Sequence, residues 1–293
     1  MTKFLEALGG KLAERWLALL LGPSLLLMIV TLVGTVLGHR RWHDTALLLS
    51  RLNRWSTEPA LRNAGTLVLL LAVVLTVSAG LGVAAGALGA AVERLWLARR
   101  PRWLARRRQR RWDAAQDAFN RALLEAARAE NSPAAAERAQ DLNARRNRIS
   151  IARPVHAFWL GDRITAVDTR LWETYRLDLA SVWPRLWLIL PEDVRAEITA
   201  ARARLTAASR LAGWAAGYLA AGVVWWPAAV IAVGTALTAR RRARVAAVAF
   251  ADLTESAVDL HARALAESLG ITCEGKLTED VGAEITTMLR KRT

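Results

Sequence analysis

Two histidines near the N-terminus have the spacing of metal ligands on a helix. His39 and His43 are four residues apart, which places both imidazoles on one helical face. Asp44 is the only carboxylate in register with them, and no cysteine is. Because a zinc site needs at least three protein ligands, we interpret both histidines as structural residues at an interface. We expect neither a metal site nor a cofactor.

The sequence contains no other recognisable catalytic motif. It has no glycine-rich phosphate loop, nucleophile elbow or HExxH pattern. The acidic pairs Glu192-Asp193 and Glu279-Asp280 fall at predicted helix starts, where carboxylates complement the helix dipole. A single cysteine, Cys273, excludes an internal disulfide. We therefore do not expect an enzyme.

The elements that would position any site are long apolar helices. Residues 66–91 form an uncharged run that exceeds the roughly 18 residues needed to cross a bilayer. An earlier run, residues 17–38, is too long for the apolar region of a signal peptide, so we expect a retained first span. Neither run contains an ionisable residue, which argues against an ion-coupled pump. The sequence predicts an all-α integral membrane protein with two N-terminal transmembrane helices.

Arginines are concentrated directly after the second span. The formal net charge is +15, and residues 99–111 contain eight of the chain's arginines. Such a block keeps the adjacent end of a span in the cytoplasm and attracts anionic lipid headgroups. We therefore favour lipid over nucleic acid as the partner of this charge. The candidate headgroup-binding residues are Arg99, Arg100, Arg102, Arg106, Arg107, Arg108, Arg110 and Arg111.

Small residues recur through the second span. Ser78, Gly82, Gly86 and Ala90 are four residues apart, a spacing that lets two helix backbones approach closely in lipid. The partner helix is either the first span of the same chain or a second copy around a central axis. In the second case the span lines a pore. The candidate helix-packing or pore-lining residues are Thr76, Ser78, Gly82, Gly86 and Gly89.

A third apolar stretch, residues 211–238, has arginines on both flanks. Because such arginines stay in the cytoplasm, we interpret the stretch as a helical hairpin. Its predicted turn is Trp225, Trp226 and Pro227, since proline disfavours a helical residue before it. The arms are short, so the hairpin is either re-entrant or lengthened by snorkelling arginines. The alternative is a single span with an external C-terminus.

The rest of the chain predicts polar helices. Ser132 and Pro133 mark a helix start within an arginine-rich helical hairpin over residues 112–151. An amphipathic helix is expected after Arg244, and a short final helix from Thr278.

Residues 1–16 predict a short amphipathic lead, and residues 39–65 a helix between the first two spans. Leu47, Leu48 and Leu52 share one face of the latter, as in a helix lying on the outer membrane surface. Its arginines would then reach the headgroups.

The segment 153–191 has a distinctive pattern of glycine, aromatic and proline residues. Its conspicuous positions are Gly161, Asp162, Tyr175, Leu177, Asp178, Trp183, Pro184, Arg185 and Leu186. This pattern resembles a group of uncharacterised multi-pass membrane proteins from actinobacteria, in which Asn is usual in place of Asp162 and Gly in place of Arg176. The resemblance implies a hydrophobic hairpin after the segment and implies no activity.

Physically, the same segment predicts two helices joined at Leu177-Asp178, the second bent at Trp183-Pro184. Trp172, Trp183 and Trp187 suit either a helix resting on the inner leaflet or the core of a cytoplasmic domain. The sequence leaves these two alternatives open.

These expectations divide the chain into four parts. Residues 1–98 form a transmembrane pair, 99–205 an arginine-rich cytoplasmic helical domain, 206–245 the hairpin and 246–293 cytoplasmic C-terminal helices. Both termini of this multi-pass protein of the cell membrane are expected in the cytoplasm. We expect a homo-oligomeric channel or regulated pore. The alternative is an anchor or scaffold that recruits a cytoplasmic protein partner to the inner leaflet.

Overall fold

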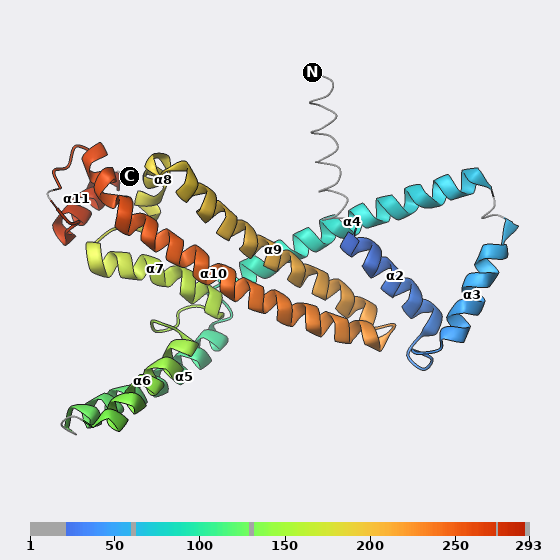
Figure 1. Ribbon diagram of the computed structural model, residues 1–293, viewed down its shortest axis with the longest axis horizontal. Coiled ribbons are helices and arrows are strands. Elements are labelled where there is room, and N and C mark those ends of the chain that lie inside the picture. The colour runs from blue at the N-terminus through green and yellow to red at the C-terminus, as the bar shows by residue number, and fades with distance from the viewer. Residues whose placement is uncertain (1–21, 60–62, 129–131, 274, 291–293) are drawn as a thin grey trace, which may run out of the picture. The chain divides into compact units, whose positions relative to one another are not determined.

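The computed structural model describes residues 22–59, 63–128, 132–273 and 275–290 (Figure 1). Within these ranges the chain forms ten helices and no strand, which confirms the predicted all-α class. The expected amphipathic lead, residues 1–16, and the first residues of the expected first span lie outside the described ranges.

The described chain divides into two compact units. Unit 1 comprises Met1–Val92 and Thr206–Arg241, and unit 2 comprises Glu93–Leu205 and Arg242–Thr293. The apolar hairpin therefore belongs to the same unit as the N-terminal helices. The division into membrane and cytoplasmic parts stays a prediction.

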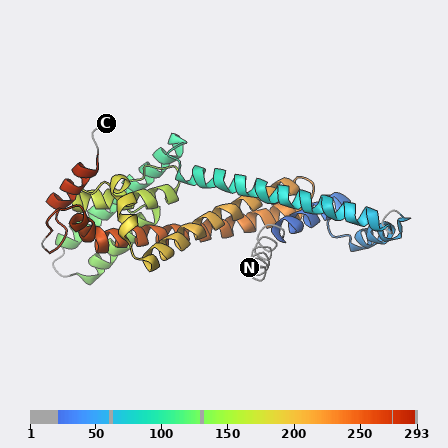
Figure 2. The same ribbon diagram turned by 90° about the horizontal axis from the view of Figure 1, so that it is seen from above.

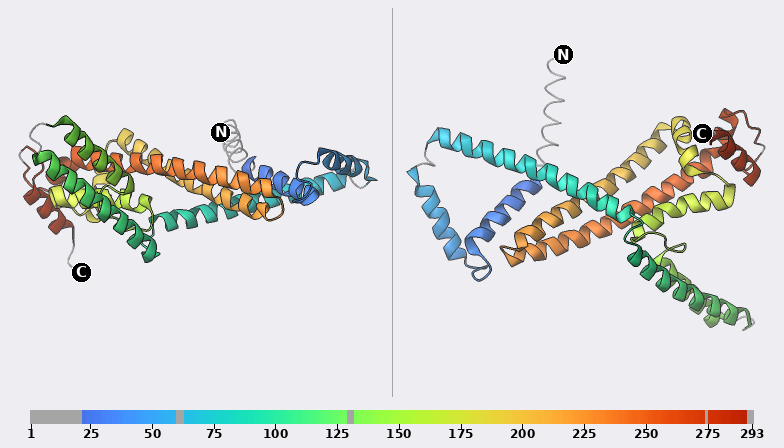
Figure 3. Two further views of the ribbon diagram at one scale, coloured as in Figure 1. Left: turned by 90° about the horizontal axis from the view of Figure 1, so that it is seen from below. Right: turned by 180° about the vertical axis from the view of Figure 1, so that it is seen from behind.

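Unit 1 begins with three successive helices, α2 (Gly22–Leu37), α3 (Thr45–Thr57) and α4 (Ala64–Leu97). They follow one another like the sides of an open triangle in Figure 1 and in the right panel of Figure 3. Asp44 caps α3, because its carboxylate accepts a hydrogen bond of 2.9 Å from the Leu47 N–H. The predicted helix between the two apolar runs is thus confirmed, and none of its residues is buried.

The apolar stretch 211–238 forms a helical hairpin. Helix α9 (Glu192–Gly222) ends at Gly222, and α10 (Trp226–Ser268) begins at Trp226, so the turn occupies residues 223–225. The two helices lie side by side in Figures 1 and 2, and a Cβ on Gly222 would lie 2.9 Å from the Ala229 Cβ. The turn therefore comes earlier than predicted: Trp226 and Pro227 begin α10, where proline needs no N–H partner.

Both hairpin helices are longer than predicted. Helix α9 starts at Glu192, and α10 continues through the arginines after residue 239 as far as Ser268. The sequence suggested a boundary near residue 245, but the arginines and alanines there are strong helix formers and give the chain no reason to stop. Each of the two helices therefore contains a polar and an apolar segment without a break between them.

Unit 2 has a core of large apolar side chains. It is built by α7 (Trp159–Tyr175), α8 (Leu179–Ile189), residues 192–205 of α9, residues 242–268 of α10, and α11 (Glu279–Leu289). The helix starts predicted at Glu192-Asp193 and Glu279-Asp280 are confirmed. The largest fully buried side chains of this core are Leu171, Leu177, Leu186, Leu265, Ile285, Val167, Val182 and Val258.

Helices α5 (Arg102–Arg128) and α6 (Pro133–Ile149) complete unit 2 as an antiparallel hairpin (Figure 1 and Figure 3, left). Alanines at 122 and 139 are buried in it, which allows close approach. Ser132 is the N-cap of α6 and Pro133 its first residue, as predicted. Helix α5, however, starts ten residues before the predicted hairpin, so most of the arginine block is itself helical.

Candidate functional site

Helix α4 carries an extensive uncovered apolar surface. Among the described residues it is the one helix long and apolar enough to cross a membrane, and only 11% of its most apolar 18-residue stretch is buried. Val68, Leu69 and Val83 are 68%, 68% and 73% exposed. The core helix of a soluble protein would bury these side chains. A contiguous exposed apolar surface of this size marks contact with a membrane or another protein.

The small residues of α4 pack against helices of the same chain. The fully buried Ser78 donates its hydroxyl to Met28 Sδ of α2 at 3.3 Å. A Cβ on Gly89 would lie 2.7 Å from the backbone of α9, and a Cβ on Gly213 of α9 would lie even closer to the Ala85 carbonyl. Close packing of α4 within the chain therefore occurs, which is one of the two interpretations of its small residues. Most of it involves the hairpin helix α9 and not the first span.

The five predicted packing or pore-lining residues do not share one face. The residues of α4 that are buried are Ser78, Gly82, Ala85 and Gly89. Residues separated by four, three and four positions stay on one side of a helix. Residues separated strictly by four positions shift around the helix axis by about 40° at each step. Consequently, no described atom outside α4 lies within 4 Å of where a Cβ on Gly86 would be. Thr76 is exposed and donates its hydroxyl to the Ala72 carbonyl at 2.8 Å.

The tryptophans at the hairpin turn contact the end of α2 and the segment after it. A Cβ on Gly34 would lie 2.7 Å from the Trp225 Cβ, so the small residue makes room for this side chain. The ring of Trp226 meets that of Trp42 edge-to-face, with centroids 5.0 Å apart. Aromatic pairs of this kind suit the interface between lipid and water.

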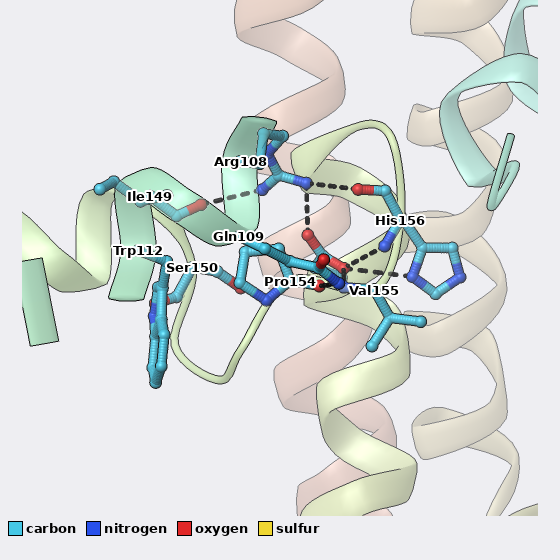
Figure 4. A network of polar contacts seen from close by, with 9 residues as sticks. Arg108, Gln109, Trp112, Ile149, Ser150, Pro154, Val155 and His156 are labelled. Atoms are coloured by element: carbon cyan, nitrogen blue, oxygen red, sulfur yellow. Dashed lines mark hydrogen bonds and ion pairs between the residues drawn. The ribbon is translucent and has the colours of Figure 1, made fainter. Parts of the chain in front are cut away.

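Arg108 differs from the other arginines of its block. The remaining seven candidates are exposed, whereas Arg108 is partly buried and forms an ion pair with Asp162 (Figure 4). Its guanidinium also donates to the carbonyls of His156 and Ile149, at 2.9 Å each. Helix α5 turns Arg108 toward the loop at 150–158, so its guanidinium binds groups of the same chain. The buried Ala105 one turn earlier on α5 is the local signal of that inward face. The headgroup role expected for the arginine block stays a prediction.

Asp162 is the centre of this network. The only sequence signal for the network is the Gly161-Asp162 pair. Its carboxylate accepts the N–H groups of Val155 and His156 at 2.8 Å each, and His156 Nδ1 lies 3.2 Å away. A Cβ on Gly161 would lie 2.7 Å from the His156 ring, so this position requires glycine. The network ties the loop before α7 to helix α5 (Figure 4).

Two further contacts reinforce the same loop (Figure 4). Gln109 donates its side-chain amide to the Pro154 carbonyl at 2.8 Å, and Trp112 donates its indole N–H to the Ser150 carbonyl at 3.0 Å. Because one carboxylate and three α5 side chains satisfy these groups, the network serves to position the loop.

The turn between α7 and α8 is closed by α11. Arg176 has a φ of 56°, the left-handed conformation that ends a helix and favours glycine. The Thr286 hydroxyl donates to the Arg176 carbonyl at 2.8 Å and accepts from the Asp178 N–H at 3.1 Å. Gly282 lies against the Tyr175 carbonyl so closely that no side chain would fit. Arg176 therefore adopts a backbone conformation that glycine takes more easily.

Asp178 has an electrostatic role in this turn. A hydrogen bond from Arg290 Nε, 2.9 Å long, lowers the pKa of the Asp178 carboxyl, and a hydrogen bond from the Ser181 hydroxyl acts in the same direction. The charged carboxylate thus links α8 to the end of α11.

Of Trp172, Trp183 and Trp187, two pack against the core of unit 2. Trp183 and Trp187 pack against the unit 2 core, with ring centroids 5.7 Å apart. Trp172 is more exposed, and the guanidinium of Arg290 lies 5.5 Å from its ring centroid. Core packing therefore accounts for Trp183 and Trp187.

The residues described above make ion pairs, close helix–helix contacts and apolar contacts. Within the described ranges, no three His, Cys, Asp or Glu side chains gather as metal ligands would. No protein-family model matches the chain, and no curated protein or solved structure matches it either.

Proposed function

We propose that this protein is an integral membrane anchor or scaffold that holds a cytoplasmic partner at the inner leaflet. The observation that carries the proposal is the uncovered apolar surface of α4, whose most apolar stretch is only 11% buried. Lipid is the environment in which such a surface is stable. Unit 2 has its own core of large side chains and would remain in water.

The proposed topology follows from the arginines. Those after α4 and those on both sides of the hairpin would keep residues 99–205 and both termini in the cytoplasm. In this topology α3 lies outside the cell, α2 and α4 form the two N-terminal spans, and the hairpin enters the bilayer from the inside. The resemblance to the actinobacterial group implies the same hairpin.

The proposed partner surface is the α5–α6 hairpin. Its arginines greatly outnumber its acids, and Leu123 and Leu124 are more than half exposed beside them. Arginines near residue 99 would contact anionic headgroups, and the remainder of the hairpin would bind an acidic face of a protein.

Membrane fractionation tests the anchor. The protein should stay in the pellet after alkaline carbonate extraction. The double substitution Leu75→Arg with Val77→Arg should release it, because each arginine near mid-span costs roughly 2.5 kcal/mol or more. Leu124→Arg on the exposed surface of α5 is the matched control and should leave the protein in the pellet. Release of the unmodified protein by carbonate would refute the proposal.

Single-cysteine labelling from outside intact cells tests the topology, in a Cys273→Ser background. Leu49→Cys on α3 should be labelled, whereas Leu124→Cys and Leu260→Cys should react only after the membrane is permeabilised. All three leucines are more than half exposed, so access to the reagent and not burial decides the result. External labelling at position 260 would mean that the third apolar stretch is a single span.

A homo-oligomeric channel is the second candidate, and the uncovered glycines of α4 favour it. Among the described residues, no atom outside α4 lies within 4 Å of where a Cβ on Gly80 or Gly86 would be, so the α4 helix of another copy has room to approach them. A mass measurement of the detergent-solubilised protein separates the two candidates. A closed ring would support the channel, and a monomer would support the anchor.

A further inference from the structure

Unit 2 contains an apolar groove that its core does not fill. The groove has a volume of about 500 Å³ and lies between α7, α8, α10 and the residues that follow α4. Its apolar walls include Ile164, Trp183 and Phe250, which are only partly buried. The volume lies within the range of sites that hold small organic molecules. An apolar surface of this size in water favours an apolar occupant.

Two opposite charges line the same groove. Arg99 follows α4, and Asp168 lies on α7; both side chains are exposed. Neither forms an ion pair within the described part of the chain, unlike the neighbouring acid Asp162 and the neighbouring base Arg163. An apolar groove with one unpaired cation and one unpaired anion is complementary to a molecule that has an apolar tail and a zwitterionic head.

The lining of the same groove also contains a backbone acceptor. Pro184 stands inside α8 and has no N–H, so the Ala180 carbonyl lacks the helical donor that it would otherwise have. Both residues line the groove. An ammonium group bound near Asp168 could supply the missing hydrogen bond.

The position of Arg99 in the chain identifies the source of the ligand. It follows the last residue of α4, Leu97, by two positions. In the proposed topology Arg99 therefore lies at the level of the inner headgroups. Lipid phosphate is the anion found at that depth, and acyl chains are the apolar groups.

We infer that the groove binds one phospholipid with a zwitterionic ethanolamine head. An acyl chain lies against Ile164, Trp183 and Phe250, the phosphate binds Arg99, and the ammonium binds Asp168 and the Ala180 carbonyl. This inference rests on the membrane insertion proposed above. It adds a defined lipid site on the cytoplasmic side to the anchor.

Native mass spectrometry of the full-length protein in detergent tests the lipid and its head. Phosphatidylethanolamine and phosphatidylglycerol with the same acyl chains serve as probes. The unmodified protein should retain one phosphatidylethanolamine in preference to phosphatidylglycerol. Asp168→Asn should weaken phosphatidylethanolamine binding about tenfold and remove the preference, because a charge-assisted hydrogen bond is lost. Glu173→Gln, an exposed acid elsewhere on α7, should leave both unchanged.

Two further variants test the groove itself. Arg99→Gln should weaken both lipids about tenfold, whereas its exposed neighbour Arg100→Gln should not. Ala180→Phe should block the groove from its exposed wall and remove the retained lipid. Thermal unfolding checks that each variant is folded. A retained lipid that is indifferent to Asp168→Asn, Arg99→Gln and Ala180→Phe, or no retained lipid in the unmodified protein, would overturn the inference.

Carbonate extraction of the membranes from which the protein is purified separates this inference from the proposed function. A protein that resists extraction but retains no phosphatidylethanolamine is an anchor without the site. A protein that carbonate releases is not an anchor, and the inference then fails with the proposed function.

Discussion

The two units bury side chains of different size. In unit 2 the core is built from Leu186, Val182 and similar residues that are 0% exposed. In unit 1 the core cluster consists largely of alanines around Leu27, Trp214 and Tyr218, while leucines and valines such as Leu69 point outward. The first arrangement is the one favoured in water, because burying large apolar side chains removes their apolar surface from contact with water.

The second arrangement is the one expected in lipid. Lipid tails solvate leucine as well as a protein core does, so helices gain by close backbone approach and small residues fill their interfaces. Ser78, Gly82 and Gly89 occupy such an interface within one chain. This difference between the units is the one that the proposed insertion of unit 1 into a bilayer would produce.

The largest expected effect comes from the same substitution made in each unit. Leu186→Ala should lower the free energy of unfolding by about 2–5 kcal/mol, because it leaves a cavity in the unit 2 core. Leu69→Ala should change it by less than about 0.5 kcal/mol, because that side chain touches little of the protein. Chemical unfolding in detergent measures both. An equally large loss for Leu69→Ala would mean that protein covers α4, which favours the channel.

The second prediction concerns charge in unit 2. Asp162→Ala should destabilise the protein by about 3 kcal/mol, because it leaves Arg108 partly buried without its partner. Asp113→Ala removes the exposed pair with Arg153 and should cost below about 1 kcal/mol. The same unfolding assay compares them. Similar losses for both aspartates would show that the network around Asp162 behaves as a surface feature.

The third prediction concerns the glycines of unit 1. Gly89→Leu should cost about 1–3 kcal/mol, because a side chain there meets the backbone of α9. At position 86 a Cβ lies near no other helix in the described part of the chain, so Gly86→Leu should leave thermal stability in detergent unchanged. Loss of subunits in Gly86→Leu, seen by crosslinking in native membranes, would show that another copy occupies that face.

The smallest expected effect depends on pH. Because the pKa of Asp178 is lowered in the folded state, its charge stabilises unit 2 above the ordinary value of 3.8, and this stability is lost as pH falls through the lower, folded value. The effect should be below about 1 kcal/mol, since Arg290 is largely exposed. Asp178→Asn should flatten the stability profile in acid. Residues 66–91 have no ionisable group and should contribute none of this dependence.

Local signals in the sequence predicted the local features of the fold. The uncharged run at 66–91 lies within one helix, and Ser132 with Pro133 starts another. The acids at 279 and 280 fall in the first turn of α11. Each of these depends on residues within a few positions of one another, which is the range over which helix propensity and capping act.

Long-range partners could not be predicted in this way. Arg108 and Asp162 are 54 residues apart, and nothing in an arginine block distinguishes the one that turns inward. The small residues of α4 predicted close packing, but their partner is α9, more than a hundred residues later. The regular four-residue spacing also predicts Gly86 as a packing residue. The helical repeat of 3.6 residues instead places Ala85 and Gly89 on the contact face.

The left-handed conformation of Arg176 bears on which residues this exposed turn of unit 2 can accept as the sequence changes. A left-handed arginine costs roughly 1–2 kcal/mol relative to glycine, yet its side chain reaches toward Glu279, at 3.7 Å, and Trp172, at 5.9 Å from the ring centroid. Exposed contacts of these two kinds contribute up to about 1 kcal/mol each, which offsets much of this strain. Arginine and glycine are therefore close to interchangeable at this turn, and a single codon change could reset the local charge of an exposed corner without altering the chain path beneath it.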